Sequence, residues 1–156
     1  GLECAGKGGV IDFTTSTTDF DLKHGEVAAA AALAEALAFG ISPMHLTLSS
    51  DGNASLPIYN NDGDLLGLQV GSVQSLYQAA RDAVLQHQVA LTDAICSISA
   101  APAAVLGLKQ KGRLAAQLDA DLVLLRRDDL HIDSVFAKGR LLVQHAKALV
   151  KGTFER

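Results

Sequence analysis

The stretch MHLTLSSDGNASLP (residues 44–57) decides the fold, because a strand pattern in it ends in an acidic turn. Residues 45–49 alternate polar and apolar side chains, which indicates a strand with one buried face. The Ser-Asp-Gly-Asn run that follows is typical of a turn, since Asp and Asn bond their own backbone and Gly accepts a positive φ. Catalytic acids of barrel enzymes also lie at the carboxyl ends of strands. Asp51 is therefore either a turn residue or a catalytic group, and composition and spacing alone favour the turn.

Patterns on both sides of this stretch predict alternating strands and helices. Residues 10–14 are β-branched and aromatic and follow two glycines, which predicts a strand. Apolar residues at helical spacing predict two helices, the first from Val27, Ala30, Leu33 and Leu37 and the second from Val73, Leu76, Ala80 and Val84. Gly40 and Pro43 mark the end of the first helix. The order strand, helix, strand, loop, helix implies parallel strands joined by a right-handed crossover.

Residues 51–64 are expected to form a long loop that includes an Asn-Asn-Asp-Gly turn. Loops longer than about 12 residues without secondary structure are usually functional or disordered. Asp51 lies after a barrel-like strand and before a long loop. Because of this position, the catalytic interpretation of Asp51 is about as well supported as the turn interpretation. A third helix is predicted beyond residue 90, with Thr92 as its N-cap. Pro102 is expected either to kink that helix or to open a separate one.

Near residue 111 the pattern changes to short β-strands. The β-like segments are residues 121–126, 134–144 and 148–153. Lys138-Gly139 divides the second segment and favours a hairpin turn. We therefore expect an α/β chain, with βα units in residues 1–110 and a small β module in residues 111–156. Two βα units cannot close a parallel sheet or cover both of its faces. The chain is therefore expected to be the end of a larger protein.

The composition excludes several classes of protein. Hydrophobic side chains make up 49% of the 156 residues and charged ones 19%, which is too apolar for a disordered chain. The formal net charge of −4 gives no basic surface for nucleic acid or anionic lipid. No apolar run reaches the roughly 20 residues of a membrane span. Cys4 and Cys96 have neither metal nor redox spacing, so we expect packing thiols and a cytoplasmic setting.

Apart from the acidic turn, the sequence lacks common catalytic motifs. The five histidines are scattered, without the H-x-H or H-E-x-x-H spacing of metal sites, and are expected to be structural. The GKGG run at residues 6–9 lacks the spacing of a phosphate-binding loop. No G-x-S-x-G elbow supports a serine nucleophile. Ser49, Ser50 and Ser55 remain as possible hydrogen-bond donors around the Asp51 turn.

Four segments resemble the amidohydrolase superfamily and, within it, the isoaspartyl dipeptidase family. TLSSDGNAS at residues 47–55 resembles the eighth strand of the barrel, and GGVIDFT at residues 8–14 resembles the seventh. DADLV at residues 119–123 is similar to the stretch that leads into the superfamily's closing β-sandwich. KGTFE at residues 151–155 matches the C-terminal ending of the dipeptidases. The strand-eight run and this ending together narrow the resemblance to the dipeptidase family.

The resemblance implies a fold. Residues 1–110 would contain strands seven and eight of a TIM-like (β/α)8 metallo-hydrolase barrel, and residues 111–156 would contain the C-terminal strands of a small β-sandwich. A complete barrel typically needs about 250 residues, so the chain is expected to be the C-terminal part of the enzyme. The family's other metal ligands and substrate-binding residues have no counterpart in this sequence and are expected to precede Gly1.

The resemblance assigns chemistry to two residues. Asp51 matches the aspartate that contacts a binuclear zinc centre, takes a proton from the activated water as it attacks the scissile carbonyl, and passes it to the leaving amine. Ser55 matches a serine that helps to bind the substrate. Gly52 is expected to let the backbone turn tightly, so that both side chains face one pocket.

We therefore hypothesise that the chain is the C-terminal segment of a zinc-dependent isoaspartyl dipeptidase. This segment is expected to be inactive alone. Its expected partners are a β-aspartyl dipeptide, the N-terminal remainder of the enzyme and further copies of itself, without nucleic acid or membrane. Two alternatives stay open. One is another amidohydrolase, such as a dihydroorotase, hydantoinase or D-aminoacylase. The other is a non-catalytic binding or assembly module that kept the barrel end without the metal ligands.

Overall fold

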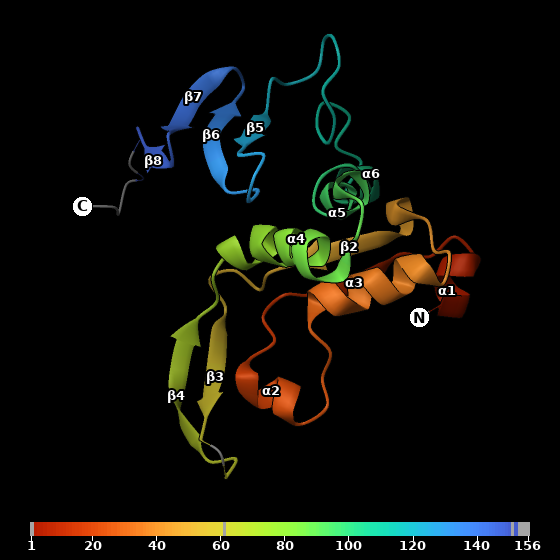
Figure 1. Ribbon diagram of the computed structural model, residues 1–156, viewed down its shortest axis with the longest axis vertical. Coiled ribbons are helices and arrows are strands. Elements are labelled where there is room, and N and C mark those ends of the chain that lie inside the picture. Colours follow the sequence, from red (N-terminus) through yellow and green to blue (C-terminus); the bar gives the residue numbers. More distant parts are fainter. Residues whose placement is uncertain (1, 61, 151, 153–156) are drawn as a thin grey trace. The chain divides into compact units, whose positions relative to one another are not determined.

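The structure is a computed structural model that describes residues 2–60, 62–150 and 152. Two compact units divide the chain, Gly1–Pro102 and Ala103–Arg156. The first contains helices and strands and the second an antiparallel sheet (Figure 1), which is the α/β class that the sequence predicts. Most of the KGTFE ending lies outside the described residues. The division after residue 110, with its assignment to barrel and sandwich, stays a prediction.

Two parallel strands form the sheet of the first unit. These are β1 (Ile11–Thr14) and β2 (Leu46–Ser49), and their predicted parallel pairing is confirmed. A parallel pair needs a crossover connection, and helix α3 (Ala29–Ala38) lies in it. The helix stops as predicted, because Gly40 adopts the left-handed conformation that ends many helices, with a φ of 83°.

Apolar side chains from the sheet and three helices form the core of the first unit. The predicted second helix is α4 (Gln74–His87), and α5 (Leu91–Cys96) follows it. Leu33 on α3 and Leu46 on β2 are fully buried. Most of the remaining buried residues are alanines, whose small side chains let the elements approach closely. The buried members of this core are Ala29, Ala30, Leu33, Ala36, Leu46, Leu48, Ala80, Ala83, Val89 and Ala94.

The region after Asp51 is a β-hairpin, so the prediction of a long loop is wrong. Its strands, β3 (Ser55–Tyr59) and β4 (Leu65–Val70), pair antiparallel. Pro57 lies within β3, and a proline argues against a strand because it has no N–H to donate to the ladder. The β4 sequence, LLGLQV, lacks the strict alternation that marks a half-buried strand. Both features concealed the hairpin at the level of sequence.

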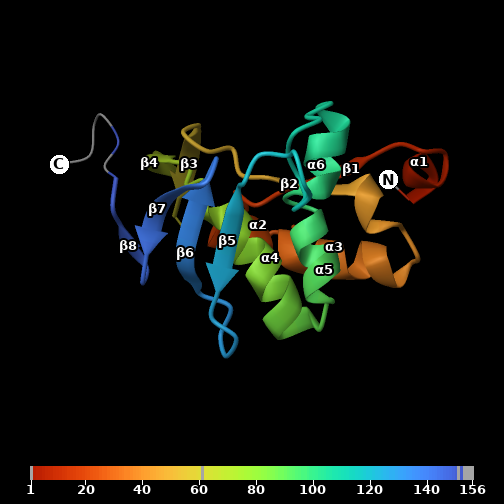
Figure 2. The ribbon, with the colours of Figure 1, turned by 90° about the horizontal axis from the view of Figure 1, so that it is seen from above.

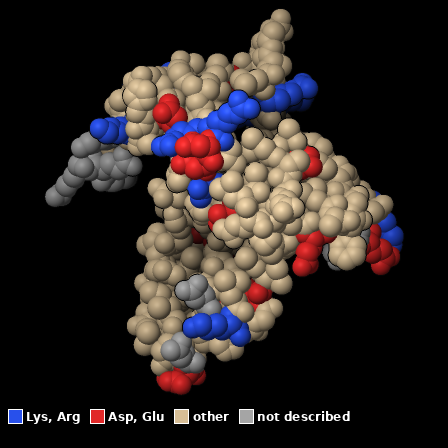
Figure 3. Space-filling view, in the orientation of Figure 1, with Lys and Arg blue, Asp and Glu red and all other residues tan. Residues whose placement is uncertain are grey.

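Apolar side chains cover the hairpin, and acidic side chains lie at its turn. The Asn60 side chain accepts hydrogen bonds from the backbone N–H groups of Asp62 at 2.9 Å and Asp64 at 2.8 Å. In Figure 3 the hairpin is tan along its length, with acidic atoms at its end. Its exposed large apolar residues are Ile58, Tyr59, Leu65, Leu66, Leu68 and Val70. This exposure agrees with the large share of hydrophobic residues in the sequence, 49%.

The remaining helices of the described residues are short. They include α1 (Leu2–Gly6) and a 3-10 turn, η1 (Pro43–His45). The N-cap of α5 is Ala90, not Thr92 as predicted. Pro102 lies in the first turn of a separate helix, α6 (Ala100–Val105), where a missing N–H costs no intrahelical bond. Within the described residues, no helix combines the length and the apolar character that crossing a membrane requires.

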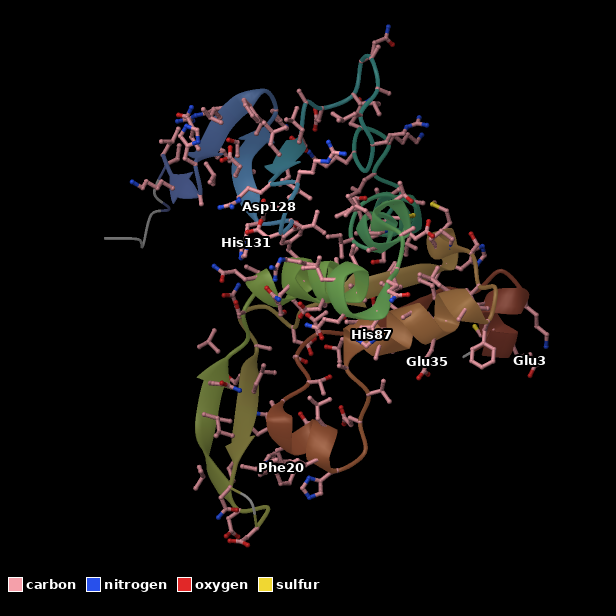
Figure 4. All side chains as sticks on the ribbon, viewed as in Figure 1. Glu3, Phe20, Glu35, His87, Asp128 and His131 are labelled. Atoms are coloured by element: carbon pink, nitrogen blue, oxygen red, sulfur yellow. The ribbon has the colours of Figure 1, made fainter. Side chains whose placement is uncertain are left out.

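Between β1 and α3 lies a short helix that the sequence analysis did not predict, α2 (Asp19–Lys23). Thr18 and Asp21 form a capping box, in which the Thr18 hydroxyl accepts from the Asp21 N–H and the Asp21 carboxylate accepts from the Thr18 N–H. The ring centroid of Phe20 lies 4.8 Å from that of Tyr59 on β3. Figure 4 shows Phe20 directed from α2 toward the hairpin. This ring contact joins α2 to the β3–β4 hairpin.

The second unit is a four-stranded antiparallel meander in chain order, as Figure 2 shows. Its strands are β5 (Leu122–Leu125), β6 (Ile132–Ala137), β7 (Arg140–Gln144) and β8 (Lys147–Ala148). Lys138 and Gly139 form the predicted β6–β7 turn with φ values of 48° and 75°. Lys111 binds both acids of the DADL run, Asp119 and Asp121, and its hydrogen bond lowers the pKa of Asp121.

Replacing Leu33 by Ala is expected to lower the free energy of unfolding by about 2–5 kcal/mol, because it empties part of a closed core. Denaturant unfolding followed by circular dichroism measures the change. The control is Leu66→Ala on β4, where the side chain is 67% exposed and the expected change is within about 0.5 kcal/mol. Equal losses in the two variants would contradict the assigned core.

Candidate functional site

The β1–β2 pair has one apolar and one polar face, because successive side chains of a strand point in opposite directions. Leu46 and Leu48 lie in the core, and Ile11 and Phe13 pack against it. The alternate residues form the opposite surface, which we term the polar face. Its members are Asp12, Thr14, Thr47 and Ser49.

Asp51 extends the polar face beyond the carboxyl end of β2. Its Oδ2 atom accepts a hydrogen bond from the Thr14 hydroxyl at 2.9 Å and another from the Ser16 hydroxyl at 2.7 Å. The backbone ladder continues to this level, since the Thr15 N–H donates to the Ser49 carbonyl at 2.7 Å. The carboxylate is therefore bound across the strand pair, from the segment that follows β1.

The two hydroxyls stabilise the ionised form of Asp51. The hydrogen bond from Ser16, followed by that from Thr14, holds the pKa of the Asp51 carboxyl below its ordinary value. Asp51 is exposed in the described structure. An ionised, accessible carboxylate of this kind can accept a proton or bind a cation.

The turn at Asp51 is built differently from the prediction that Gly52 supplies its conformational freedom. Asp51 and Asn53 take the left-handed conformation, with φ values of 47° and 67°, whereas Gly52 does not. Asp and Asn tolerate this conformation better than most residues. Gly52 is needed for space instead, because a Cβ atom there would lie 2.3 Å from Cγ1 of Val73.

The base of the hairpin holds the main chain of Asp51 in place. The Ala54 N–H donates to the Asp51 carbonyl at 2.9 Å, and the Asn53 N–H donates to the Gly71 carbonyl at 2.9 Å. A Cβ atom added at Gly71 would lie 2.3 Å from the Asp51 carbonyl oxygen. The hairpin that the sequence did not predict is therefore part of the support of the candidate site.

Ser55 is the first residue of β3, opposite Val70 of β4, and is exposed. It lies at the base of the hairpin, four residues after Asp51. Within the described residues no hydrogen bond joins the Asp51 and Ser55 side chains. The substrate-binding role of Ser55 stays a prediction.

A second carboxylate on the polar face was missed by the sequence analysis. Asp12 accepts from the Thr47 hydroxyl at 2.6 Å and from the Ser49 hydroxyl at 2.5 Å. The signal that could have revealed it was alternation: Asp12 and Thr14 fall on one face of β1, and the parallel register places hydroxyl residues of β2 opposite them. This cluster ties the two strands together on the side away from the core.

The segment after β1 is also fixed to α4. The hydroxyls of Thr15 and Ser75 are 2.6 Å apart, and this contact is partly buried. Together with the Phe20–Tyr59 ring contact, it joins the segment after β1 to the elements that follow β2. Neither of these two contacts involves Ser16 or Asp51 directly.

The amidohydrolase family model matches residues 23–142. The chain belongs to the amidohydrolase family. The match covers most of the chain and spans both units, from α2 in the first to β7 in the second. The predicted superfamily resemblance is confirmed.

The similarity to solved structures is more specific than the match to the family model. The β-aspartyl dipeptidase of the thermophilic, keratin-degrading Fervidobacterium islandicum AW-1, in complex with the β-Asp-Leu dipeptide, is 30% identical over 97% of this chain, with a TM-score of 0.78. A second structure of this dipeptidase is 28% identical, with 97% covered and a TM-score of 0.74. N-acetylglucosamine-6-phosphate deacetylase from Pasteurella multocida is 14% identical over 86% of the chain, with a TM-score of 0.59, and is similar in fold alone. The chain spans 38%, 36% and 37% of the protein chains in these three structures.

Amidohydrolases are typically metal-dependent, and the described residues fit one ligand of such a metal. The Asp51 carboxylate is exposed and ionised, and no described residue donates a hydrogen bond to its Oδ1 atom. In the described part of the chain, no three His, Cys, Asp or Glu side chains gather as a metal site. A metal bound at Asp51 would need further ligands from outside these residues.

Replacing Gly71 by Ala is expected to lower the free energy of unfolding by about 1–3 kcal/mol, since the new methyl group would collide with the Asp51 carbonyl. Gly67→Ala in the same hairpin is the matched control, because a Cβ atom there meets nothing within 4 Å. Denaturant unfolding compares the two. A Gly71 variant as stable as the Gly67 variant would show that the hairpin base does not hold Asp51 tightly.

Proposed function

We propose that this chain is the C-terminal segment of a zinc-dependent isoaspartyl dipeptidase, which hydrolyses the isopeptide bond of β-aspartyl dipeptides with water. The observation that carries the proposal is the Asp51 carboxylate, fixed at the carboxyl ends of two parallel strands with one oxygen bound by two hydroxyls. Catalytic groups of barrel enzymes lie at this end of the strands. The similarity to a dipeptidase crystallised with β-Asp-Leu supports the substrate class.

In the proposed reaction Asp51 moves one proton. Its carboxylate accepts a proton from the water as the water oxygen forms a bond to the scissile carbonyl carbon. It then donates this proton to the leaving amine as the C–N bond breaks, so that the carboxylate is regenerated. Asp51 is ionised at neutral pH, and the hydrogen bonds from Ser16 and Thr14 hold its pKa below the ordinary value. The Ser55 hydroxyl binds the dipeptide near this carboxylate.

Two zinc ions, when bound, would polarise the scissile carbonyl and lower the pKa of the attacking water. Asp51 would be a ligand within this chain. The remaining ligands would come from the N-terminal remainder of the enzyme, which is the first proposed partner. Further copies of the chain are the second, because the hairpin exposes apolar side chains. A cytoplasmic location stays a prediction.

Asp51→Asn in the full-length gene product is expected to lower kcat on β-Asp-Leu at least about 100-fold, because an amide cannot accept the proton. Steady-state release of leucine measures it. The matched control is Asp62→Asn, an exposed carboxylate at the hairpin turn, which should retain wild-type kcat. Removal of metal with a chelator should abolish hydrolysis, and added zinc should restore it.

Other results of the same assay separate the alternatives. Unchanged turnover in Asp51→Asn would refute the role assigned to this carboxylate. Hydrolysis of dihydroorotate, a hydantoin or an N-acyl-D-amino acid in place of β-Asp-Leu would identify a different amidohydrolase. A full-length protein that neither binds zinc nor hydrolyses any member of this panel would be a non-catalytic module.

A further inference from the structure

The parallel register explains why hydroxyls meet the Asp51 carboxylate. Thr14 of β1 pairs with Ser49 of β2. Two residues further along each chain, at the same face, stand Ser16 and Asp51. The segment after β1 therefore places one hydroxyl at the end of the strand and a second beyond it, and both reach the acid on the neighbouring chain.

Both hydroxyls bind the same carboxylate oxygen. Thr14 Oγ1 and Ser16 Oγ each carry a single proton, and the ionised carboxylate accepts both at Oδ2. The two hydroxyl oxygens lie 2.9 Å apart, held there by their common acceptor. An oxygen of a carboxylate has about two lone-pair sites, so Oδ2 is filled. Among the described residues, no donor reaches Oδ1.

We propose that Thr14 and Ser16 are positioning residues that fill Oδ2 of Asp51 and so present Oδ1 to the metal centre and to the attacking water. This inference rests on the proposed function. The final torsion of an aspartate side chain is broad and nearly two-fold, so a carboxylate on an exposed turn rotates readily between equivalent orientations. Two donors from the adjoining strand select one orientation and fix the plane of the group.

Loss of such outer partners weakens a metal site by a characteristic amount. Hydrogen bonds to a ligating carboxylate orient it, and their removal typically costs 10–100-fold in metal affinity or activity. Ser16 donates over the shorter distance, 2.7 Å against 2.9 Å for Thr14. The Thr14 oxygen in turn accepts from the Ser16 N–H at 3.5 Å. Removal of the Ser16 hydroxyl should therefore have the larger effect of the two.

The test removes each hydroxyl in the full-length gene product and measures zinc binding as well as turnover. The variants are Ser16→Ala, Thr14→Val and the double variant, with Ser16→Thr and Thr14→Ser as conservative replacements that keep a hydroxyl. Competition between the metal-free protein and a chelator gives the dissociation constant for Zn²⁺. For the double variant we expect this constant to rise about 10–100-fold and kcat on β-Asp-Leu to fall by a similar factor, with KM within about twofold. The conservative variants should restore both values.

Thr15→Val is the matched control, because it removes a hydroxyl bond from the same segment without contacting Asp51. It should lower thermal stability while zinc affinity and kcat stay at the wild-type values. If the wild-type protein binds zinc and hydrolyses β-Asp-Leu but the double variant equals it in both, the inference alone fails. If Thr15→Val loses zinc affinity as strongly as the double variant, the effect comes from the segment's folding and the inference also fails. A wild-type protein that neither binds zinc nor hydrolyses β-Asp-Leu would overturn the proposed function and the inference together.

Discussion

The parallel pairing of β1 with β2 is the constraint on which the candidate site depends. It directs Leu46 and Leu48 into the core and leaves the alternate residues on the polar face. A slip of one residue in register would exchange these faces. Burial of the apolar face fixes the register of the two strands. This register places the hydroxyls of Thr14 and Ser16 opposite the Asp51 carboxylate.

Two hydroxyl–carboxylate clusters lie along this polar face. Asp12 binds hydroxyls of β2 from its place on β1, and Asp51 binds hydroxyls from β1 and the segment after it, so the donors run in both directions across the pair. The first cluster lies within the ladder and ties the strands together. The second lies beyond the strand ends, and there the described residues donate to Oδ2 of the carboxylate but not to Oδ1. Strand position thus distinguishes a structural acid from a candidate reactive one of the same chemical type.

The sequence predicted the parts of the fold that depend on local patterning. Periodicity and turn chemistry predict the strand before Asp51, the helix that stops before Gly40 and the turn at Lys138-Gly139, and the structure confirms them. The hairpin was missed because Pro57 and the non-alternating β4 sequence argue against strands, while its pairing is a non-local contact. Ser16 and Asp12 were missed for a related reason, since their partners lie 35 to 37 residues away and only the register reveals them. The Asp51 turn was expected to rely on Gly52, whereas its left-handed residues are Asp51 and Asn53.

Anomalous diffraction at the zinc absorption edge, from crystals of the full-length gene product grown with zinc, tests most directly whether Asp51 serves a metal centre. A zinc peak about 2.0–2.2 Å from Oδ1 of Asp51 is expected, with the hydroxyls of Thr14 and Ser16 still bound to Oδ2. A carboxylate that points to bulk solvent, with zinc absent from its neighbourhood or bound elsewhere, would contradict the assignment of Asp51 to a metal-dependent hydrolytic site.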